Sequence, residues 1–394
     1  MTRIVYADNA ATTSLSRHAL EEMMPYLTKK YGNPSTVYSL GRSAKKAMEN
    51  ARAKIASALG CRPDEIFITS GGTEADNWAI RSAAIMKKDK GKHIISTVLE
   101  HHAVLHTLKS LEKAGYEVTY LGVDSAGNIS LDELKNTIRQ DTILITVIAA
   151  SNEIGTIMPI AEIGALAREK GILFHTDAVQ AVGHIPVNTE EMKIDLLSLS
   201  AHKFKGPKGI GALYIKKGLR LPSNMYGGAQ ERGLRSGTEN VAGIVGMAAA
   251  LEEAVSNMDN NIKKISAMRD RLIDGLLKIP YTRLTGDPVN RLPGSASFVF
   301  ECIEGESMVL LLDQAGICAS SGSACSSGSL DPSHVLLAIG LPHEVAHGSL
   351  RLSLNEDNTE EDVDYILEKL PPIISRLRDM SPLWEEKISG KPIK

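Results

Sequence analysis

The chain has 394 residues, of which 43% are hydrophobic and 23% are charged, and its formal net charge is −3. This composition is typical of a folded globular protein, and the length is enough for a large core and two domains. The charge is nearly balanced, without a concentrated basic stripe, which argues against direct binding of nucleic acid.

The sequence also lacks the features of a secreted or membrane protein. Its beginning, "MTRIVYADNAATT", contains no apolar leader, and no apolar run approaches the ~20 residues that span a bilayer. The four cysteines (Cys61, Cys302, Cys318 and Cys325) show neither paired nor metal-ligand spacing, so no disulfide scaffold is expected. We therefore expect a cytoplasmic protein that does not act at a membrane.

Strands and helices alternate through the first part of the chain. Apolar, β-branched runs predict strands at 65–70, 93–98, 117–122, 142–148, 172–177, 194–200 and 210–215. Amphipathic stretches such as 74–88 and 160–171 lie between them. Continuous apolar strands separated by helices predict an α/β domain with a largely parallel seven-stranded sheet covered on both faces.

The pattern changes in the last third. Apolar residues recur every three to four positions over 241–278, which predicts one long helix. Beyond it we predict strands at 295–301 and 348–354, with helices at 306–315, 333–340 and 359–378. We therefore expect a large domain over 16–255 and a smaller α+β domain made of 1–15 and 256–394.

One loop of the smaller domain has an unusual composition. The stretch "SSGSACSSGSLDP", residues 320–332, places Cys325 among serines and glycines. Such a segment cannot bury a core and is typical of a mobile loop. On composition alone the cysteine is either an incidental exposed thiol or a nucleophile carried on a flexible segment.

Ligands of an open parallel sheet bind at the carboxyl ends of its strands, so the residues there are the first candidates for a site. After the first strand, "SGGTEADN" (70–77) opens a helix whose N–H groups and Thr73 hydroxyl suit a phosphate, although Gly71 and Gly72 also fit a plain turn. Asp177 ends the strand at 172–177. It is either a helix cap or a carboxylate that keeps a heterocyclic nitrogen protonated.

Two further strand ends carry a lysine and a histidine. Lys203 follows the strand at 194–200, with Ser200 and His202 beside it, and the flanking apolar strands suit a partly desolvated amine that forms a Schiff base. His101 follows the strand at 93–98 and either stacks on a flat ring or caps a helix. A phosphate cradle, a pyridinium partner, a Schiff-base lysine and a stacking ring are what pyridoxal 5′-phosphate (PLP) requires of a protein.

The chain also resembles a known family. The stretches "YADNAATT", "TSGGTEADN", "EHHAVL", "HTDAVQAVG", "SAHKFKGPKGIGALY", "ERGLRSGTEN" and "SSGSACSSG" are similar to those of cysteine desulfurases of the nitrogen-fixation and iron–sulfur-cluster type. The resemblance implies the class V aminotransferase family, the PLP-dependent transferase fold type I and a homodimer. It also implies conversion of L-cysteine to L-alanine. The sulfur would pass as a persulfide on Cys325 to an acceptor protein, such as an iron–sulfur scaffold, with tRNA thiolation as a further use.

The resemblance implies a role for each matching residue. Lys203 binds PLP covalently, and His101 stacks on its ring and helps to move protons. Further cofactor contacts are implied for Gly72, Thr73, Asn152, Asp177, Gln180, Ser200 and His202, and for Thr238, which reaches the phosphate in the neighbouring subunit. Asn152 and Arg351 bind the carboxylate side of the substrate, Arg351 by a bidentate fork. No resident metal is expected, and transient ligation of a cluster by Cys325 stays open.

Two departures from the family leave details open. Ser151 stands where a second asparagine is usual, and "NEDN" (355–358) stands where relatives have a glycine and an aromatic residue. The long stretch after Cys325 favours the housekeeping and nitrogen-fixation branch. A selenocysteine lyase, another class V aminotransferase or a sulfur-relay assembly protein are the alternatives. An aminotransferase has no use for Cys325, and an assembly protein has no need of the PLP-binding residues.

Overall fold

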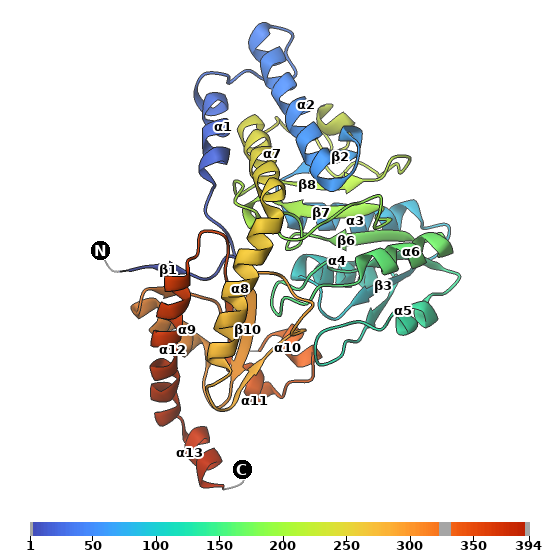
Figure 1. The fold of residues 1–394 in the computed structure, drawn as a ribbon. Helices are drawn as coiled ribbons and strands as arrows, with labels where there is room; N and C mark the ends of the chain where they lie inside the picture. Colours follow the sequence, from blue (N-terminus) through green and yellow to red (C-terminus); the bar gives the residue numbers. More distant parts are fainter. Residues whose placement is uncertain (1–2, 323–331, 391–394) are drawn as a thin grey trace.

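The centre of the molecule is a seven-stranded β-sheet (Figure 1). The computed structural model describes residues 3–322 and 332–390. The strand order is β2-β8-β7-β6-β5-β3-β4, and all neighbours are parallel except β8, which is antiparallel to β2 and β7. The strands are β2 (Ile66–Thr69), β3 (His93–Thr97), β4 (Glu117–Leu121), β5 (Thr142–Thr146), β6 (Leu173–Asp177), β7 (Leu196–Ser200) and β8 (Gly211–Ile215). The predicted, mostly parallel sheet is confirmed.

Helices cover both faces of this sheet. On β3, Ile94 belongs to one buried cluster together with Trp78 and Leu108, whereas Ile95 belongs to another together with Ile163. Neighbouring residues of one strand are therefore buried on opposite faces, which explains the continuous apolar runs. The surrounding helices are α3 (Gly72–Met86), α4 (His102–Lys113), α5 (Leu131–Thr137) and α6 (Ile160–Lys170).

The prediction of one long helix over 241–278 is wrong in one respect, because the structure has two helices there with a break between them. The structure has α7 (Val241–Ser256) and α8 (Met258–Leu276), bent by 72° at Asn257. The side chain of Asn257 donates a hydrogen bond to the carbonyl of Glu253 (2.9 Å). Asparagine competes in this way with regular helical bonding, which explains a break that an apolar periodicity does not reveal.

Within the described residues, no single helix has the length and apolar character of a membrane span. The bent pair α7 and α8 meets that test only when its two helices are taken together.

The C-terminal part forms a separate layer. Its antiparallel sheet has the order β12-β10-β9, and the short strands β1 and β11 pair in parallel beside it. These strands are β1 (Val5–Tyr6), β9 (Thr282–Leu284), β10 (Ser295–Phe300), β11 (Ile317–Cys318) and β12 (Ser349–Ser353). The helices are α9 (Gly305–Gln314), α10 (His334–Ala338), α11 (His343–Ala346), α12 (Glu360–Asp379) and α13 (Pro382–Ser389). A buried cluster drawn from Val5 and Ala7 and from residues 265–374 supports the predicted small domain, whose boundaries stay a prediction.

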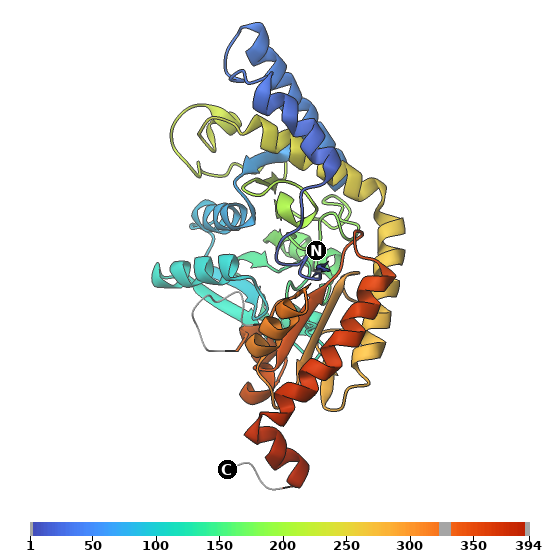
Figure 2. The ribbon, with the colours of Figure 1, turned by 90° about the vertical axis from the view of Figure 1, so that its left-hand side faces the viewer.

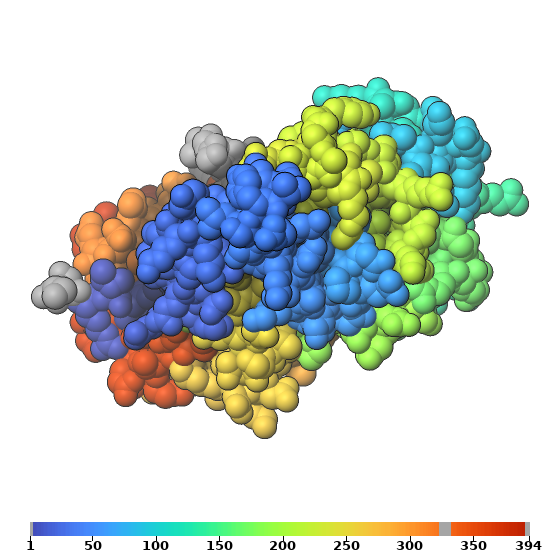
Figure 3. Space-filling view, turned by 90° about the horizontal axis from the view of Figure 1, so that it is seen from above, coloured from blue at the N-terminus to red at the C-terminus, as the bar shows by residue number. Residues whose placement is uncertain are grey.

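The N-terminal segment links the two layers, and in Figure 2 the N-terminus lies between them. Beyond β1 the chain crosses to the large sheet, where the backbone N–H of Thr13 donates to the carbonyl of His202 (3.0 Å). It then forms α1 (Arg17–Thr28) and α2 (Ser39–Leu59), which pack against α7. Figure 3 shows these two helices beside the yellow-green segment that follows β8. Arg52 of α2 pairs there with Glu231 (2.7 Å).

Candidate active site

A cavity of about 320 Å³ lies at the carboxyl ends of the sheet strands and is closed by the N-terminal segment and β12. It is lined by Ala10, Ala11, Gly72, Thr73, Asp76, His101, Ile148, Asn152, Asp177, Val179, Gln180, Ser200, His202, Lys203 and Arg351. The structure thus brings together the predicted cofactor and substrate residues except Thr238, whereas Cys325 lies outside the described residues. The volume is within the range of small-molecule sites.

One end of the cavity is the N-terminus of α3. A side chain at Gly72 would place its Cβ 2.6 Å from Cγ2 of Val179, so glycine is needed for the close approach of this turn. The helix begins at Gly72 and Thr73, and its first backbone N–H groups have no acceptor within the helix. The hydroxyl of Ser200 lies across this turn, 3.5 Å from a Cβ built on Gly71. Free N–H groups next to hydroxyls form an anion site suited to a phosphate.

Another wall of the cavity carries the buried carboxylate of Asp177, at the end of β6. One of its oxygens accepts the backbone N–H of Val179 (3.0 Å), and the residue lines the cavity. The helix-cap interpretation is wrong, because a turn and not a helix follows β6. Burial raises the pKa of Asp177, while the nearby His101 and Lys203 act in the opposite direction. A cationic ring nitrogen placed against this carboxylate would keep it ionised.

Asp76 of α3 is a second buried acid at this wall, and sequence reasoning missed it. Its Oδ1 has no hydrogen-bond partner in the described part of the chain. Ligand atoms of Asp76, His101 and Asp177 all lie within 4.8 Å of one another. Burial, followed by the charge of Asp177, raises the pKa of Asp76 well above its usual range. No sequence signal distinguished Asp76 from an ordinary helical residue.

His101 lies at the start of α4 and is oriented by the helix. Its Nδ1 accepts the backbone N–H of Ala103 (3.1 Å), so the proton of the neutral ring is on Nε2. Burial lowers the pKa of His101, which favours this neutral form. The histidine is therefore both a helix cap, as one interpretation predicted, and a wall of the cavity.

Lys203 is held by the N-terminal segment, a contact that sequence reasoning did not predict. It lies in the short 3₁₀ helix η2 (Ala201–Lys203), and its Nζ donates to the carbonyls of Ala10 (2.6 Å) and Ala11 (2.9 Å). Gln180 Nε2 donates to the same Ala10 carbonyl (2.9 Å). In the sequence analysis the "YADNAATT" stretch (6–13) served only to show the resemblance to the family. In the structure it forms one side of the site.

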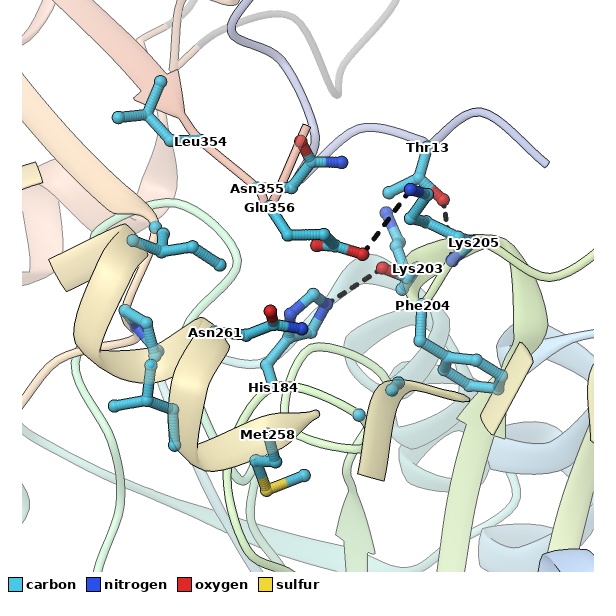
Figure 4. Close-up of a pocket in the computed structure, with 16 residues that line it drawn as sticks. Thr13, His184, Lys203, Phe204, Lys205, Met258, Asn261, Leu354, Asn355 and Glu356 are labelled. Atoms are coloured by element: carbon cyan, nitrogen blue, oxygen red, sulfur yellow. Dashed lines mark hydrogen bonds and ion pairs between the residues drawn. The ribbon is translucent and has the colours of Figure 1, made fainter. Parts of the chain in front are cut away.

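The backbone of Lys203 is fixed from behind, as Figure 4 shows. The Nε2–H of His184 donates to the Lys203 carbonyl (2.9 Å), and burial lowers the pKa of this histidine. Lys205 Nζ pairs with Asp357 (2.7 Å) and lies 3.6 Å from Glu356. The departure at 355–358 therefore braces the lysine loop from outside the cavity.

Arg351, on β12, forms the substrate-side wall. Its Nη1 donates to the carbonyl of Asn152 (2.9 Å), and its Nη2 pairs with Asp8 (3.0 Å). Both Nη atoms are thus engaged, and the bidentate fork stays a prediction. Ser151 accepts the N–H groups of Glu153 and Ile154 (3.3 Å each). The departure at this position therefore shapes the turn after β5 and does not line the cavity.

Two predicted residues remain. Thr238 is exposed, in the turn between η3 (Gln230–Gly233) and α7. Cys325 lies outside the described residues. After that stretch, Ser333 caps α10 and donates a hydrogen bond to Glu153, whose pKa burial raises to about 7.

The residues present fit PLP. A phosphate suits the free N–H groups at the start of α3, and a protonated ring nitrogen suits Asp177, whose burial disfavours an unpaired charge. The amine of Lys203 reaches the same cavity. Together with the sheet topology, these features define a PLP-dependent transferase of fold type I.

Comparison with known proteins agrees with this class. Residues 5–366 match the class V aminotransferase family. The cysteine desulfurase IscS of Methanosarcina thermophila is 57% identical over 381 residues, which cover 97% of this chain and 94% of the relative. A solved structure described as a NifS-like protein is 41% identical with a TM-score of 0.90, covering 95% of this chain and all of its own. The structure of SspA in complex with cysteine is 37% identical, with a TM-score of 0.78 and coverage of 89% and 98%. The chain belongs to the class V aminotransferase family and, within it, to the cysteine desulfurases.

Proposed function

We propose that the protein converts L-cysteine into L-alanine and transfers the sulfur, as a persulfide on Cys325, to an acceptor protein for iron–sulfur cluster assembly. The observation that carries this proposal is the convergence of Lys203, Asp177, His101 and Arg351 on one cavity. These residues come from separate elements of the chain and from both layers of the fold. Relatives that cover nearly the whole chain are cysteine desulfurases, which supports the same reaction here.

PLP is the proposed cofactor. Gly72, Thr73, Ser200 and His202 would hold its phosphate, Asp177 and Gln180 its ring, and Lys203 its aldehyde carbon. When bound, PLP supplies an electron-withdrawing ring that stabilises negative charge at the substrate Cα. Burial lowers the pKa of His202 to about 4. This histidine would therefore contact the phosphate as a neutral group.

The cavity residues divide the remaining work. Arg351 and Asn152 bind the carboxylate of cysteine, which orients its Cα toward the lysine. Lys203 takes the Cα proton on Nζ, the atom that the Ala10 and Ala11 carbonyls hold in the cavity. His101 would cover the cofactor ring when PLP is bound, with a proton on Nε2 and its Nδ1 engaged by the helix.

Cys325 completes the reaction as the nucleophile. Its thiolate attacks the substrate sulfur, so that an S–S bond forms while the Cβ–S bond breaks. The electron pair of the broken bond passes to carbon, which is protonated, and alanine leaves. The persulfide then carries the sulfur to an acceptor.

A homodimer is also proposed, with Thr238 of one subunit at the phosphate site of the other. Large apolar side chains are exposed around α1, α2 and the segment after β8, including Tyr31 (72% exposed), Val37 (86%) and Tyr226 (88%). A cluster of this kind on a folded protein supports a protein contact. The acceptor protein and a cytoplasmic location stay predictions from the sequence.

Alanine formation from L-cysteine tests the reaction. We expect the purified protein with PLP to release one alanine for each sulfur transferred, and Lys203→Ala to abolish it. Cys325→Ser is expected to bind cysteine without transferring sulfur. Alanine formation that survives Lys203→Ala would overturn the proposal, and full turnover by Cys325→Ser would favour a selenocysteine lyase or another class V aminotransferase.

A further inference from the structure

The N-terminal segment places one carboxylate directly against the arginine of the substrate wall. Asp8 Oδ1 lies 3.0 Å from Nη2 of Arg351, and both side chains are largely buried, with 16% and 6% exposed. The pair joins a segment near the chain start to a strand near its end. The resemblance to the cysteine desulfurases, as described above, assigns no role to Asp8.

The guanidinium of Arg351 is not fully satisfied by its neighbours. It carries N–H donors on Nε, Nη1 and Nη2. Nη1 donates to the Asn152 carbonyl and Nη2 to Asp8. Nε is buried and has no hydrogen-bond partner in the described part of the chain, while the side chain lines the cavity. A buried donor without an acceptor is costly, so the guanidinium, which lines the cavity, has hydrogen-bonding capacity left for a ligand.

Asp8 is itself held firmly. Its Oδ2 accepts the hydroxyl of Ser320 (2.8 Å), and Ser320 and Arg351 exchange backbone hydrogen bonds (2.7 and 3.2 Å). The Asp8 carbonyl accepts the N–H of Ala11 (3.0 Å), which closes the turn whose carbonyls hold Lys203. The position of Asp8 is therefore fixed relative to both the arginine and the lysine.

We propose that Asp8 is a positioning residue for Arg351, holding Nη2 so that the guanidinium stays oriented to receive the carboxylate of the amino-acid substrate. The proposal rests on the proposed function, in which Arg351 binds that carboxylate. It assigns to Asp8 a geometric role in substrate affinity and no contact with the reacting atoms.

A geometric role and an electrostatic role predict opposite effects of two conservative variants. In Asp8→Asn, the amide oxygen can still accept from Nη2, and the amide N–H can donate to the Ser320 hydroxyl, which also accepts. This variant therefore keeps both contacts and loses the charge. Asp8→Glu keeps the charge but is longer by one methylene in a mostly buried place, so it must displace the guanidinium. If Asp8 acted only through its charge, it would repel an incoming carboxylate, and Asp8→Asn would bind the substrate more tightly.

The experiment is a calorimetric titration of the PLP-loaded protein with L-alanine and with L-alaninamide, in which a neutral amide replaces the carboxylate. For Asp8→Glu we expect the dissociation constant of L-alanine to rise about tenfold, with that of L-alaninamide changed less than about twofold. For Asp8→Asn we expect both constants to stay within about threefold of the starting values. Arg3→Ala is the matched control, because it removes an exposed ion pair of the same N-terminal segment.

The outcomes distinguish a failure of the Asp8 proposal from a failure of the proposed function on which it rests. Asp8→Glu without an effect on L-alanine, equal losses for both ligands, or tighter binding of L-alanine by Asp8→Asn would each overturn the positioning role. Arg351→Ala tests the proposed function itself, in which Arg351 binds the substrate carboxylate. If that variant still prefers L-alanine over L-alaninamide, the carboxylate site itself is wrongly assigned, whatever the Asp8 variants show.

Discussion

Among single residues, Glu100 is the most deeply buried acid next to the cavity. One of its oxygens accepts the hydroxyl of Thr97 (2.8 Å) and the N–H of Ile148 (2.9 Å). The other oxygen has no hydrogen-bond partner in the described part of the chain. Burial raises the pKa of Glu100 from 4.5 to about 8, so the side chain is protonated near neutral pH. The folded chain therefore keeps the carboxyl proton of Glu100 at pH values at which the unfolded chain has lost it.

Glu100→Gln should therefore change how stability depends on pH. In the unfolded chain the carboxyl group loses its proton near pH 4.5, whereas the folded chain keeps it to about pH 8. Stability falls as pH rises through this window, and the penalty is complete above it. Glutamine mimics the protonated acid, so at pH 8.5 we expect the free energy of unfolding by urea to be larger for the variant than for the parent, by on the order of 4 to 5 kcal/mol. At pH 4 we expect the two free energies to be equal. Parallel pH profiles for the two proteins would contradict this account.

The residues around the cavity differ in how far the sequence predicts them. Lys203, Asp177 and His101 each follow an apolar strand, and the carboxyl ends of parallel strands meet, so their proximity was predictable. The position of Asp8 and of the Ala10 and Ala11 carbonyls at the site was not predictable, because the N-terminal segment reaches the site from a different layer. That docking depends on packing between distant segments, which no local pattern encodes. The roles of the site residues stay predictions.

At the scale of elements, Arg291 connects the two layers of the fold. It is 4% exposed and donates hydrogen bonds to the carbonyls of Ile154, Thr285, Asp287 and Ser295 (3.0–3.2 Å). Burial lowers its pKa to about 10. The turn after β5, which carries Asn152, is thereby tied to the β9–β10 connection. The arginine supplies the donors that these buried carbonyls need.

Arg291→Leu should destabilise the protein strongly. The substitution keeps much of the side-chain volume but leaves several buried carbonyls without a donor, so we expect a loss of about 3 kcal/mol or more in the free energy of unfolding by urea. Arg271→Leu is the control, because Arg271 joins α8 to α12 through an exposed ion pair with Glu360 (2.7 Å). Its effect should be several times smaller. Equal losses in the two variants would contradict the structural role of Arg291.

Element prediction succeeded where a strand or helix carries its own pattern. Six of the seven sheet strands are buried along their whole length and only the edge strand β4 is partly exposed, so most apolar runs were continuous enough to locate the strands. The strands β1, β9 and β11 were missed because they have only two or three residues and exist through their pairing partners. The break at Asn257 was missed because the apolar periodicity continues across it.

At the scale of the whole molecule, the proposed dimer combines residues of two chains in each site. Thr238 is exposed and outside the cavity of its own chain, whereas Lys203 lines that cavity. A site would then need the lysine of one subunit and the threonine of the other. Variants of these two residues should therefore complement each other.

Mixing tests this arrangement. Lys203→Ala has no active site, and Thr238→Ala is expected to bind PLP weakly. After the two variants are unfolded together and refolded, mixed dimers contain one site with both native residues, so activity should recover in roughly a quarter of all sites. Recovery is measured as alanine formation at limiting PLP. Activity equal to the average of the separate variants would contradict a shared site.

The most direct test of the central claim is mass spectrometry of the protein after brief incubation with PLP and L-cysteine. We expect the peptide that contains Cys325 to gain one sulfur atom, with an equal amount of alanine in solution, and the Cys325→Ser peptide to gain none. Sulfur on another cysteine, or alanine without any sulfur on the protein, would contradict a desulfurase that transfers sulfur through Cys325.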